Sequence, residues 1–349
     1  MNRQLKYFEA IREATDQAMA ADPAVYIMGL GVPDPKGIFG TTLGLKEKYG
    51  SARVMDMPTS ENAMTGIAIG SAIRGMRPIM THQRVDFFFL ALDQLINNAA
   101  KWRFMFADQM KAPIVIRLIM GRGWGQGPQH SQSLHSMLAH IPGLTVVMPS
   151  NPYDAKGLLL SAVQSLDPVV YFEHRWLHGV HGDVPQNPYT VPFGKARVVQ
   201  EGKDVTVVAL SHMTLEAFRA AKQLDGENIS VEVIDVRSLK PLDTETILTS
   251  VRKTGRLVVA DPDTKSVGFA AEILAQVAEA AWDDLKCAPL RITYPDAPTP
   301  TSWPLSNAYY PTSEHIAEAI LRQVGRPARP IIVPTRPMDA PDPTFTGPF

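Results

Sequence analysis

The sequence predicts an α/β fold of two doubly wound domains, the second smaller than the first. Short apolar segments alternate with amphipathic segments of helical length through most of the 349 residues, an order typical of parallel sheets covered by helices. The run Pro113–Met120 is almost continuously apolar, as expected for a strand buried on both faces. Near residues 186–203 the alternation stops, and a second series follows it. With 45% hydrophobic residues, the chain is long enough for two cores.

The first domain is expected over residues 1–185 and begins with a helix over residues 5–20. Thr59 and Ser60 offer N-caps for a small-residue helix that begins at Glu61. Strands are expected over residues 25–30, 54–57, 78–81, 113–120, 144–148 and 169–172, and further helices over residues 61–74, 86–106 and 152–165.

The second domain is expected over residues 204–325. Its strands are expected over residues 204–210, 230–236, 256–260 and 290–293, and its helices over residues 215–224, 243–252 and 269–282. Residues 186–203 lack a sustained period and are expected to form a linker. Residues 326–349 contain many prolines, so an extended tail is expected there.

Composition excludes several classes of protein. The formal net charge is -1, with basic residues spread along the chain, so nucleic acid is not an expected partner. The single Cys287 cannot form an internal disulfide, which favours a reducing compartment. No apolar run approaches the roughly 18 residues of a membrane span, and the N-terminal segment carries mixed charges. We therefore expect a cytoplasmic protein that does not bind a membrane.

The glycine series Gly121–Gly127 follows the most apolar predicted strand. It lacks the G-x-G-x-x-G spacing and no helix is expected to begin within it, so a dinucleotide site is disfavoured. A mobile loop and a functional loop both fit, and Arg122 and Trp124 could gate a pocket or simply anchor such a loop. His130 follows among small polar residues, where it could serve as an acid or base, or cap the next helix.

Glu61 and Phe87 are ambiguous when each is considered alone. A carboxylate at a helix N-terminus is stabilised by the helix dipole without any catalytic role. The cluster Phe87–Phe89 on an amphipathic helix is more often core than a platform for a cofactor. Neither feature identifies a function by itself.

Several ordered segments share the pattern of one known family. They are Asp56–Glu61, Gly66–Gly70, Gly75–Pro78, Leu92–Asn97, Gln129–Gln132, Pro142–Ser150, Asp154–Gly157 and Asp235–Asp243. In this order they resemble the β subunits of 2-oxo acid dehydrogenase E1 components, of the pyruvate, branched-chain and acetoin dehydrogenase types, within the transketolase superfamily. The likeness extends to about residue 325.

The resemblance implies a pyrimidine-binding domain followed by a transketolase C-terminal domain, in an α2β2 heterotetramer with thiamine diphosphate at each α/β interface. Glu61 matches the glutamate that hydrogen-bonds the cofactor's aminopyrimidine ring, and Phe87 matches the residue that packs on that ring. His130 matches a histidine placed near the substrate carbonyl. The likeness also places Leu30, Thr59 and Gln83 at the cofactor, with Leu30 where many members carry an acidic residue.

The metal that the cofactor's diphosphate needs has no evident binding motif in this chain. Mg²⁺ is held in such enzymes by a Gly-Asp-Gly motif followed later by Asn, and no Gly-Asp-Gly occurs here. An α-type partner is therefore expected to bind Mg²⁺. The resemblance also implies a K⁺ site built largely from backbone carbonyls, which would fall around Ile114, Ala162 and Asp167.

The expected activity is decarboxylation of a 2-oxo acid and transfer of the acyl group to the lipoyl carrier of an acyltransferase, E2. One alternative is the β half of a split decarboxylase or carboligase of transketolase type that uses no lipoyl carrier, and another is a non-catalytic scaffold subunit. Arg84 stands in a segment that is more apolar in better-known members. It could bind a substrate carboxylate or phosphate, or be an ordinary surface arginine.

Overall fold

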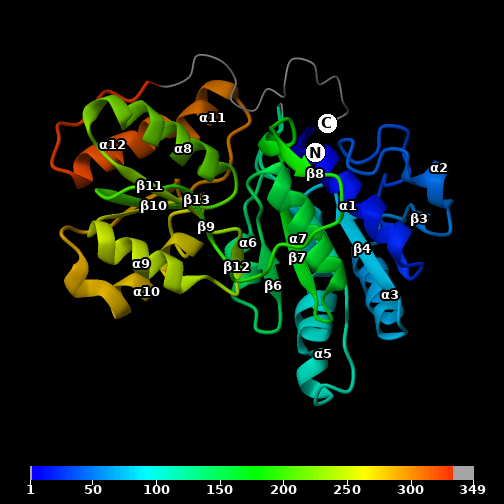
Figure 1. Cartoon of the computed structure of the whole chain (residues 1–349). Helices are drawn as coiled ribbons and strands as arrows, with labels where there is room; N and C mark the ends of the chain where they lie inside the picture. The colour runs from blue at the N-terminus through cyan, green and yellow to red at the C-terminus, as the bar shows by residue number, and fades with distance from the viewer. Residues whose placement is uncertain (1, 124, 333–349) are drawn as a thin grey trace.

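The computed structural model describes residues 2–123 and 125–332. These residues form two α/β domains that lie side by side, one from the first half of the chain and one from the second (Figure 1). Each domain is built on a mainly parallel sheet with helices on both faces. The predicted fold class is therefore confirmed.

A seven-stranded sheet forms the centre of the first domain. In spatial order its strands are β12 (Ser238–Lys240), β6 (Thr145–Val147), β7 (Val169–His174), β5 (Val115–Met120), β4 (Arg77–His82), β2 (Val25–Met28) and β3 (Val54–Met55). Neighbours from β6 to β3 are parallel, whereas β12 runs antiparallel to β6. Strand β5 is buried along its whole length, as its apolar sequence predicts.

Helices cover both faces of this sheet. They are α1 (Tyr7–Ala21), α2 (Leu45–Tyr49), α3 (Glu61–Ile73), α4 (Val85–Phe88), α5 (Ala100–Met105), α6 (His135–Ala139) and α7 (Pro152–Gln164). Helices α1 and α7 pack on one face, and α3, α5 and α6 pack on the other. Strands β1 (Asn2–Lys6) and β8 (His181–Pro185) form a separate antiparallel pair.

The second domain holds a five-stranded sheet. Its order is β14 (Leu290–Tyr294), β13 (Leu257–Thr264), β10 (Val205–Ala209), β11 (Val231–Asp235) and β9 (Arg197–Gln200), with only β9 antiparallel to its neighbour. The helices are α8 (His212–Leu224), α9 (Thr244–Thr254), α10 (Phe269–Ala281), α11 (Trp303–Tyr309) and α12 (Ser313–Gln323). Helices α8 and α12 cover one face of the sheet and α9 and α10 the other (Figure 1). Strand β9 lies within residues 186–203, the range expected to be a linker.

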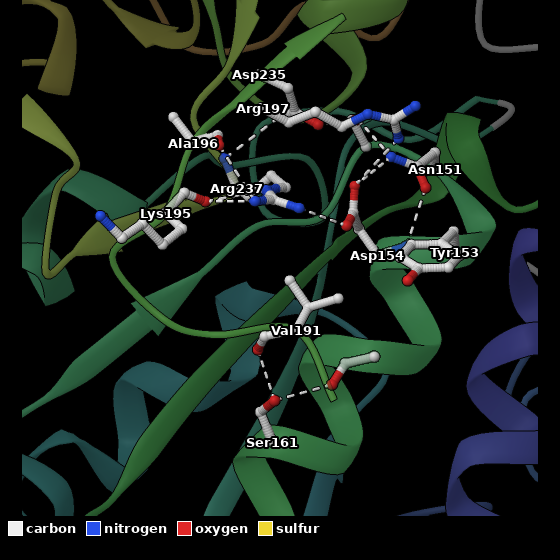
Figure 2. Close-up of polar contacts among 12 residues, drawn as sticks. Asn151, Tyr153, Asp154, Ser161, Val191, Lys195, Ala196, Arg197, Asp235 and Arg237 are labelled. Carbon is white, nitrogen blue, oxygen red and sulfur yellow. Dashed lines mark hydrogen bonds and ion pairs between the residues drawn. The ribbon is translucent and has the colours of Figure 1, made fainter. Parts of the chain in front are cut away.

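Three of the family-like segments meet where the domains join, and Figure 2 shows the contact between two of them, at Asp154 and Arg237. Arg237 follows β11, and its Nη1 donates to Asp154 Oδ1 on α7 at 2.8 Å, while its Nη2 donates to the Lys195 carbonyl at 2.7 Å. Ser150 Oγ donates to Asp235 Oδ2 at 2.5 Å. One buried apolar cluster also continues from the first domain into the second. The segments 142–150, 154–157 and 235–243 therefore hold the domains together.

Two predicted helices needed correction, and one predicted segment lies partly outside the described residues. The predicted helix over residues 5–20 begins later, because residues 2–6 pair with β8 as strand β1. The predicted helix over residues 86–106 is broken into α4, a 3₁₀ turn (Phe89–Ala91), a π-helix (Gln94–Ala99) and α5, a change of register that an apolar period cannot reveal. Residues 326–332 form neither helix nor strand, and the rest of the predicted tail lies outside the described residues.

Further 3₁₀ turns lie outside the helices named above. They lie at Arg175–Leu177, Asp225–Glu227 and Trp282–Asp284. None of the helices in the described ranges combines the length and apolarity that a bilayer crossing requires.

Candidate active site

Four loops at the carboxyl edge of the first sheet carry the residues that the sequence singled out. They follow β2, β3, β4 and β5. In this order they contain Leu30, Thr59 with Glu61 at the start of α3, Gln83 with Phe87 on the short helix α4, and His130. Ligands of doubly wound α/β proteins bind at this edge, because the loops there converge.

Hydrogen bonds tie the loops after β2, β3 and β4 together. Gln83 Nε2 donates to the Leu30 carbonyl oxygen at 2.9 Å. Asp56 Oδ1, just before Thr59, accepts from the Gly31 backbone nitrogen at 2.9 Å. Leu30 therefore contributes its backbone carbonyl to the cluster.

Contacts with the loop after β5 complete the cluster. Asp86 Oδ1 accepts from Gln132 Nε2 at 2.8 Å. The ring of Phe87 meets that of His130 edge to face, with 5.3 Å between the centroids and 90° between the planes. The structure thus brings Phe87 and His130 together.

Glu61 is the first residue of α3 and is only 6% exposed. Among the described residues, no hydrogen bond or ion pair engages its carboxylate. The helix dipole stabilises negative charge here, and neither carboxylate oxygen is fully enclosed, so a bound ligand can reach them. The site therefore fits a ligand that brings a hydrogen-bonding group to Glu61. Thr59 is exposed, and the N-cap residue Ser60 makes no side-chain capping bond.

His130 lies exposed in the loop that precedes α6. Helix α6 begins at His135 with Leu134 as its N-cap residue, so the alternative in which His130 caps this helix is wrong. The next residue, Ser131, is buried, and its hydroxyl has no partner among the described residues. His130 is thus accessible to a bound ligand.

Arg84 is not a surface arginine, and that alternative is wrong. It is 3% exposed, and its Nη1 donates to the Gly121 carbonyl oxygen at 2.9 Å. Burial lowers the pKa of Arg84 to about 10, although the charge of Asp86 opposes the change. The side chain is therefore a buried cation at neutral pH.

Arg122 anchors the glycine-rich loop. It is 1% exposed, and its Nε donates to the Gln126 carbonyl oxygen at 2.7 Å. Its Nη1 reaches Ser306 Oγ at 3.2 Å, and its Nη2 donates to the carbonyl of Thr301 in the second domain. These bonds make Arg122 a clamp between the loop and the second domain. Trp124, its expected companion in a gate, lies outside the described residues.

The three residues expected at a K⁺ site surround one short loop between α7 and β7. The Ala162 carbonyl accepts from the Ser165 backbone nitrogen at 3.2 Å, and the Ile114 carbonyl accepts from the Val169 backbone nitrogen at 2.9 Å. The Asp167 carboxylate pairs with Arg103 at 2.5 Å, and its backbone carbonyl accepts from Ser165 Oγ at 2.9 Å. All three carbonyls thus accept a hydrogen bond within the chain, and K⁺ would have to use their second lone pairs.

Two buried histidine groups near this edge escaped sequence prediction. The His174 and His212 rings stack with 4.0 Å between centroids, and burial holds the pKa of His174 well below its usual range, with smaller contributions from His212 and other neighbouring basic groups. His135 bonds Asp261 at 2.8 Å and approaches Asp263 at 3.5 Å, a set of groups that could hold a metal ion. The partners in each group come from different domains, so no local motif could have revealed them.

The domains of this chain match two known families. Residues 3–179 match the pyrimidine binding domain of transketolase, and residues 194–316 match the transketolase C-terminal domain. A solved structure titled as a split-gene transketolase, an inactive β4 tetramer, aligns with a TM-score of 0.75 over 91% of this chain and 97% of that chain. At 22% identity this likeness shows the fold alone. The chain therefore belongs to the transketolase superfamily.

Proteins of known name that are similar to this chain define its family within the superfamily. It is 44% identical to the β subunit of an acetoin:2,6-dichlorophenolindophenol oxidoreductase from Cupriavidus necator, covering 91% of this chain and 97% of the relative. It is 42% identical to a pyruvate dehydrogenase E1 β subunit from Acholeplasma laidlawii and 39% identical to a 2-oxoisovalerate dehydrogenase β subunit from Bacillus subtilis, each covering 92% of this chain and 98% of the relative. The chain belongs to the β-subunit family of the thiamine diphosphate-dependent 2-oxo acid dehydrogenases.

Proposed function

We propose that this chain forms, with an α-type partner, an enzyme that decarboxylates a 2-oxo acid and transfers the acyl group to a lipoyl carrier on E2. The observation that carries the proposal is Glu61, a side chain only 6% exposed whose carboxylate has no partner among the described residues, in the loop cluster that also presents Phe87 and His130. Family membership supplies the chemistry that such a cluster can serve.

The three side chains have distinct roles in this proposal. Glu61 hydrogen-bonds a ring nitrogen of the cofactor's aminopyrimidine, since a carboxylate in a largely dry site shares a proton effectively. The flat face of Phe87 packs on that ring and excludes water. His130 is exposed on the loop beside Phe87, where it can move a proton to or from the substrate carbonyl oxygen. Thiamine diphosphate, when bound, supplies the electron sink for carbon–carbon bond cleavage. Leu30, Thr59 and Gln83 shape the wall around it.

The other half of the site must come from a second chain. The sequence has no Gly-Asp-Gly motif for Mg²⁺, so an α-type subunit holds the metal and the diphosphate. We infer an α2β2 heterotetramer with the cofactor at the α/β interface. A chain with a single cysteine suits the cytoplasm. K⁺ at the loop around Ile114, Ala162 and Asp167 would raise the melting temperature relative to Na⁺ at equal ionic strength.

The first experiment is native mass spectrometry of the chain with and without its co-purifying partner. We expect an α2β2 mass that retains thiamine diphosphate and Mg²⁺ only in the assembled state. A lone homodimer that binds both tightly would contradict the half-site argument. Supplying the assembled enzyme with a lipoyl domain or with an aldehyde as acceptor then separates the dehydrogenase from a carboligase.

A matched pair of variants tests the role of Glu61. Glu61→Gln should assemble normally yet lose about 10²- to 10⁴-fold in activity, the usual range for a positioned proton-transfer group. Glu47→Gln, an exposed carboxylate on α2, should keep full activity. An unchanged rate in the assembled Glu61→Gln enzyme would favour the scaffold function instead.

A further inference from the structure

Three arginines lie at the same edge of the first sheet, each just beyond the end of a parallel strand. Arg84 follows β4, Arg122 follows β5 and Arg175 follows β7. These strands are adjacent in the order β7, β5, β4. Because carboxyl ends of neighbouring parallel strands meet at one edge, the topology gathers three cations where ligands bind in this fold class.

Arg84 has an unused hydrogen-bond donor. Nη1 donates to the Gly121 carbonyl oxygen at 2.9 Å, whereas Nη2 is buried and has no hydrogen-bond partner among the described residues. No described carboxylate forms an ion pair with this guanidinium. A buried cation with an unsatisfied donor is costly, so an anionic partner is expected.

Arg175 adds a second positive charge beside the first. The ring of Phe39 contacts both guanidinium groups, with its centroid 5.5 Å from Arg84 Cζ and 4.3 Å from Arg175 Cζ. Burial and then the charge of Arg84 lower the pKa of Arg175 to about 10, although the charge of Glu173 opposes them. An aromatic ring attracts cations but carries no net charge, so it cannot neutralise them.

Two carboxylates act on this pair, and neither forms an ion pair with Arg84. Glu173 forms an ion pair with Arg117 at 2.8 Å, and both side chains are fully buried. Asp86 keeps its negative charge near Arg84, because the hydrogen bonds that its Oδ1 accepts from Gln132, at 3.3 and 2.8 Å, come from neutral groups. With Glu173 paired to Arg117, the charge of Asp86 is the one further negative charge that the described neighbours place against Arg84 and Arg175.

Arg84 belongs to the loop cluster of the candidate active site. The Phe87 backbone nitrogen donates to the Arg84 carbonyl oxygen at 3.3 Å, and the Phe87 ring contacts His130. The backbone of Gly123 passes over Nη2, where an added Cβ would lie 3.0 Å from this atom. A ligand group that reaches Nη2 must displace this segment of the loop, which continues directly to His130.

We propose that Arg84 binds a second anionic group of the substrate, a carboxylate or a phosphate remote from the 2-oxo acid group, with Arg175 contributing positive charge. This rests on the proposed function. The carboxylate of the 2-oxo acid itself must leave as neutral carbon dioxide, so a cation that bound it would stabilise the substrate more than the transition state and oppose decarboxylation. A buried cation is better suited to an anionic group that the product retains. A planar guanidinium matches both carboxylate and phosphate oxygens. The substrate class is therefore a dicarboxylic or phosphorylated 2-oxo acid, in preference to one with an aliphatic side chain.

The test compares three substrates with the assembled enzyme: 2-oxobutanoate, 2-oxoglutarate and a 2-oxo acid phosphorylated on its side chain. We expect one of the two anionic substrates to have the highest kcat/KM, and its identity distinguishes carboxylate from phosphate. Arg84→Gln should lower that kcat/KM by at least about tenfold, mainly through KM, the effect of losing one charged hydrogen bond. The value for 2-oxobutanoate should stay the same or rise, and Arg84→Lys should recover part of the loss.

Arg219→Gln is the matched control, since Arg219 is an exposed arginine of the second domain paired with Glu216. Arg219→Gln should leave kcat/KM unchanged for all three substrates. A preference for 2-oxobutanoate in the wild-type enzyme, or an Arg84→Gln enzyme with an unaltered preference among the three, would overturn the proposal.

Direct binding separates this proposal from the proposed function. If the assembled enzyme decarboxylates none of the substrates, the proposed function fails, and equilibrium dialysis of the chain with inorganic phosphate or succinate still tests Arg84. Saturable binding of either probe that Arg84→Gln abolishes, and Arg84→Lys retains in part, would support an anion site. Equal binding by wild type and Arg84→Gln, or binding by neither, would refute it.

Discussion

The carboxyl group of Asp235, at the junction of the domains, makes stability depend on pH in a direction opposite to that of most aspartates. It is fully buried, and its oxygens accept from Ser150 Oγ at 2.5 Å and from the Arg237 backbone nitrogen at 3.2 Å. Burial, and then the negative charge of Asp154, raises the pKa of Asp235 from 3.8 to about 7. We predict that Asp235→Asn removes a loss of stability that the wild-type protein shows as pH rises.

The size of this loss follows from the two pKa values. Between pH 3.8 and about pH 7 the folded carboxyl group keeps a proton that the unfolded one has released. The free energy of unfolding therefore falls by about 1.4 kcal/mol for each pH unit in this window, or about 4 kcal/mol in total, because the unfolded state binds fewer protons. The contribution of Asp235 to the free energy of unfolding is fully present below pH 3.8 and is lost above about pH 7.

Urea denaturation of wild type and Asp235→Asn at several values of pH from 5 to 8 measures the effect. Since Asn carries no charge, the difference between the two free energies of unfolding should move in favour of the variant by about 1–3 kcal/mol across that range. Asp243→Asn is the control. Burial raises the pKa of Asp243, but hydrogen bonds from Ala196 and Thr246 outweigh it and lower the pKa, so its contribution is lost only in acid. Parallel pH profiles for wild type and Asp235→Asn would refute the reasoning.

Two further substitutions test buried contacts beneath the candidate site. Arg117→Met leaves the charge of Glu173 buried without its ion-pair partner, so it should lower the free energy of unfolding by about 3–5 kcal/mol in urea denaturation. Adding Glu173→Gln should recover much of this loss. A loss of less than about 1 kcal/mol would show that the ion pair is weak. Gly121→Ala should cost more than about 1 kcal/mol by thermal denaturation, because φ is +88° and the new Cβ would lie 2.6 Å from the His174 ring. Gly125 has a φ of +67° but open space around it, so Gly125→Ala should destabilise the protein less than Gly121→Ala does. Equal destabilisation by the two substitutions would show that the contact with His174 adds nothing.

The central elements could be predicted because their sequence patterns are local. Strand β5 is one apolar run, and α9 has an N-cap aspartate, an amphipathic period and a C-terminal glycine, Gly255. Strands β8 and β9 escaped prediction because they are short and largely exposed, so that only pairing with distant segments makes them strands. Helix α12 also escaped prediction, although Thr312 caps it and its apolar residues keep a helical period.

The same holds for the candidate site: residues in local patterns could be predicted, and contacts between distant segments could not. Glu61, Phe87 and His130 could be located because each lies in a short segment with a family pattern, and the structure brings Phe87 and His130 into contact. The burial of Arg84 could not be foreseen, since it depends on the loop after β5 folding over the end of β4. The bond between His135 and Asp261 joins residues 126 positions apart, which no local pattern encodes.

Strand β12 has a consequence for synthesis on the ribosome. It belongs to the second half of the chain but forms the last strand of the first sheet, where Ser238 pairs with Val147. The nascent first sheet therefore presents the open edge of β6 until Lys240 has been translated. At about 5–20 residues per second, translating the intervening segment takes roughly 5–20 seconds, a long interval for an unpaired strand edge, which can template aggregation. Chaperone capture of nascent chains that end before β12 should exceed capture of those that end after it.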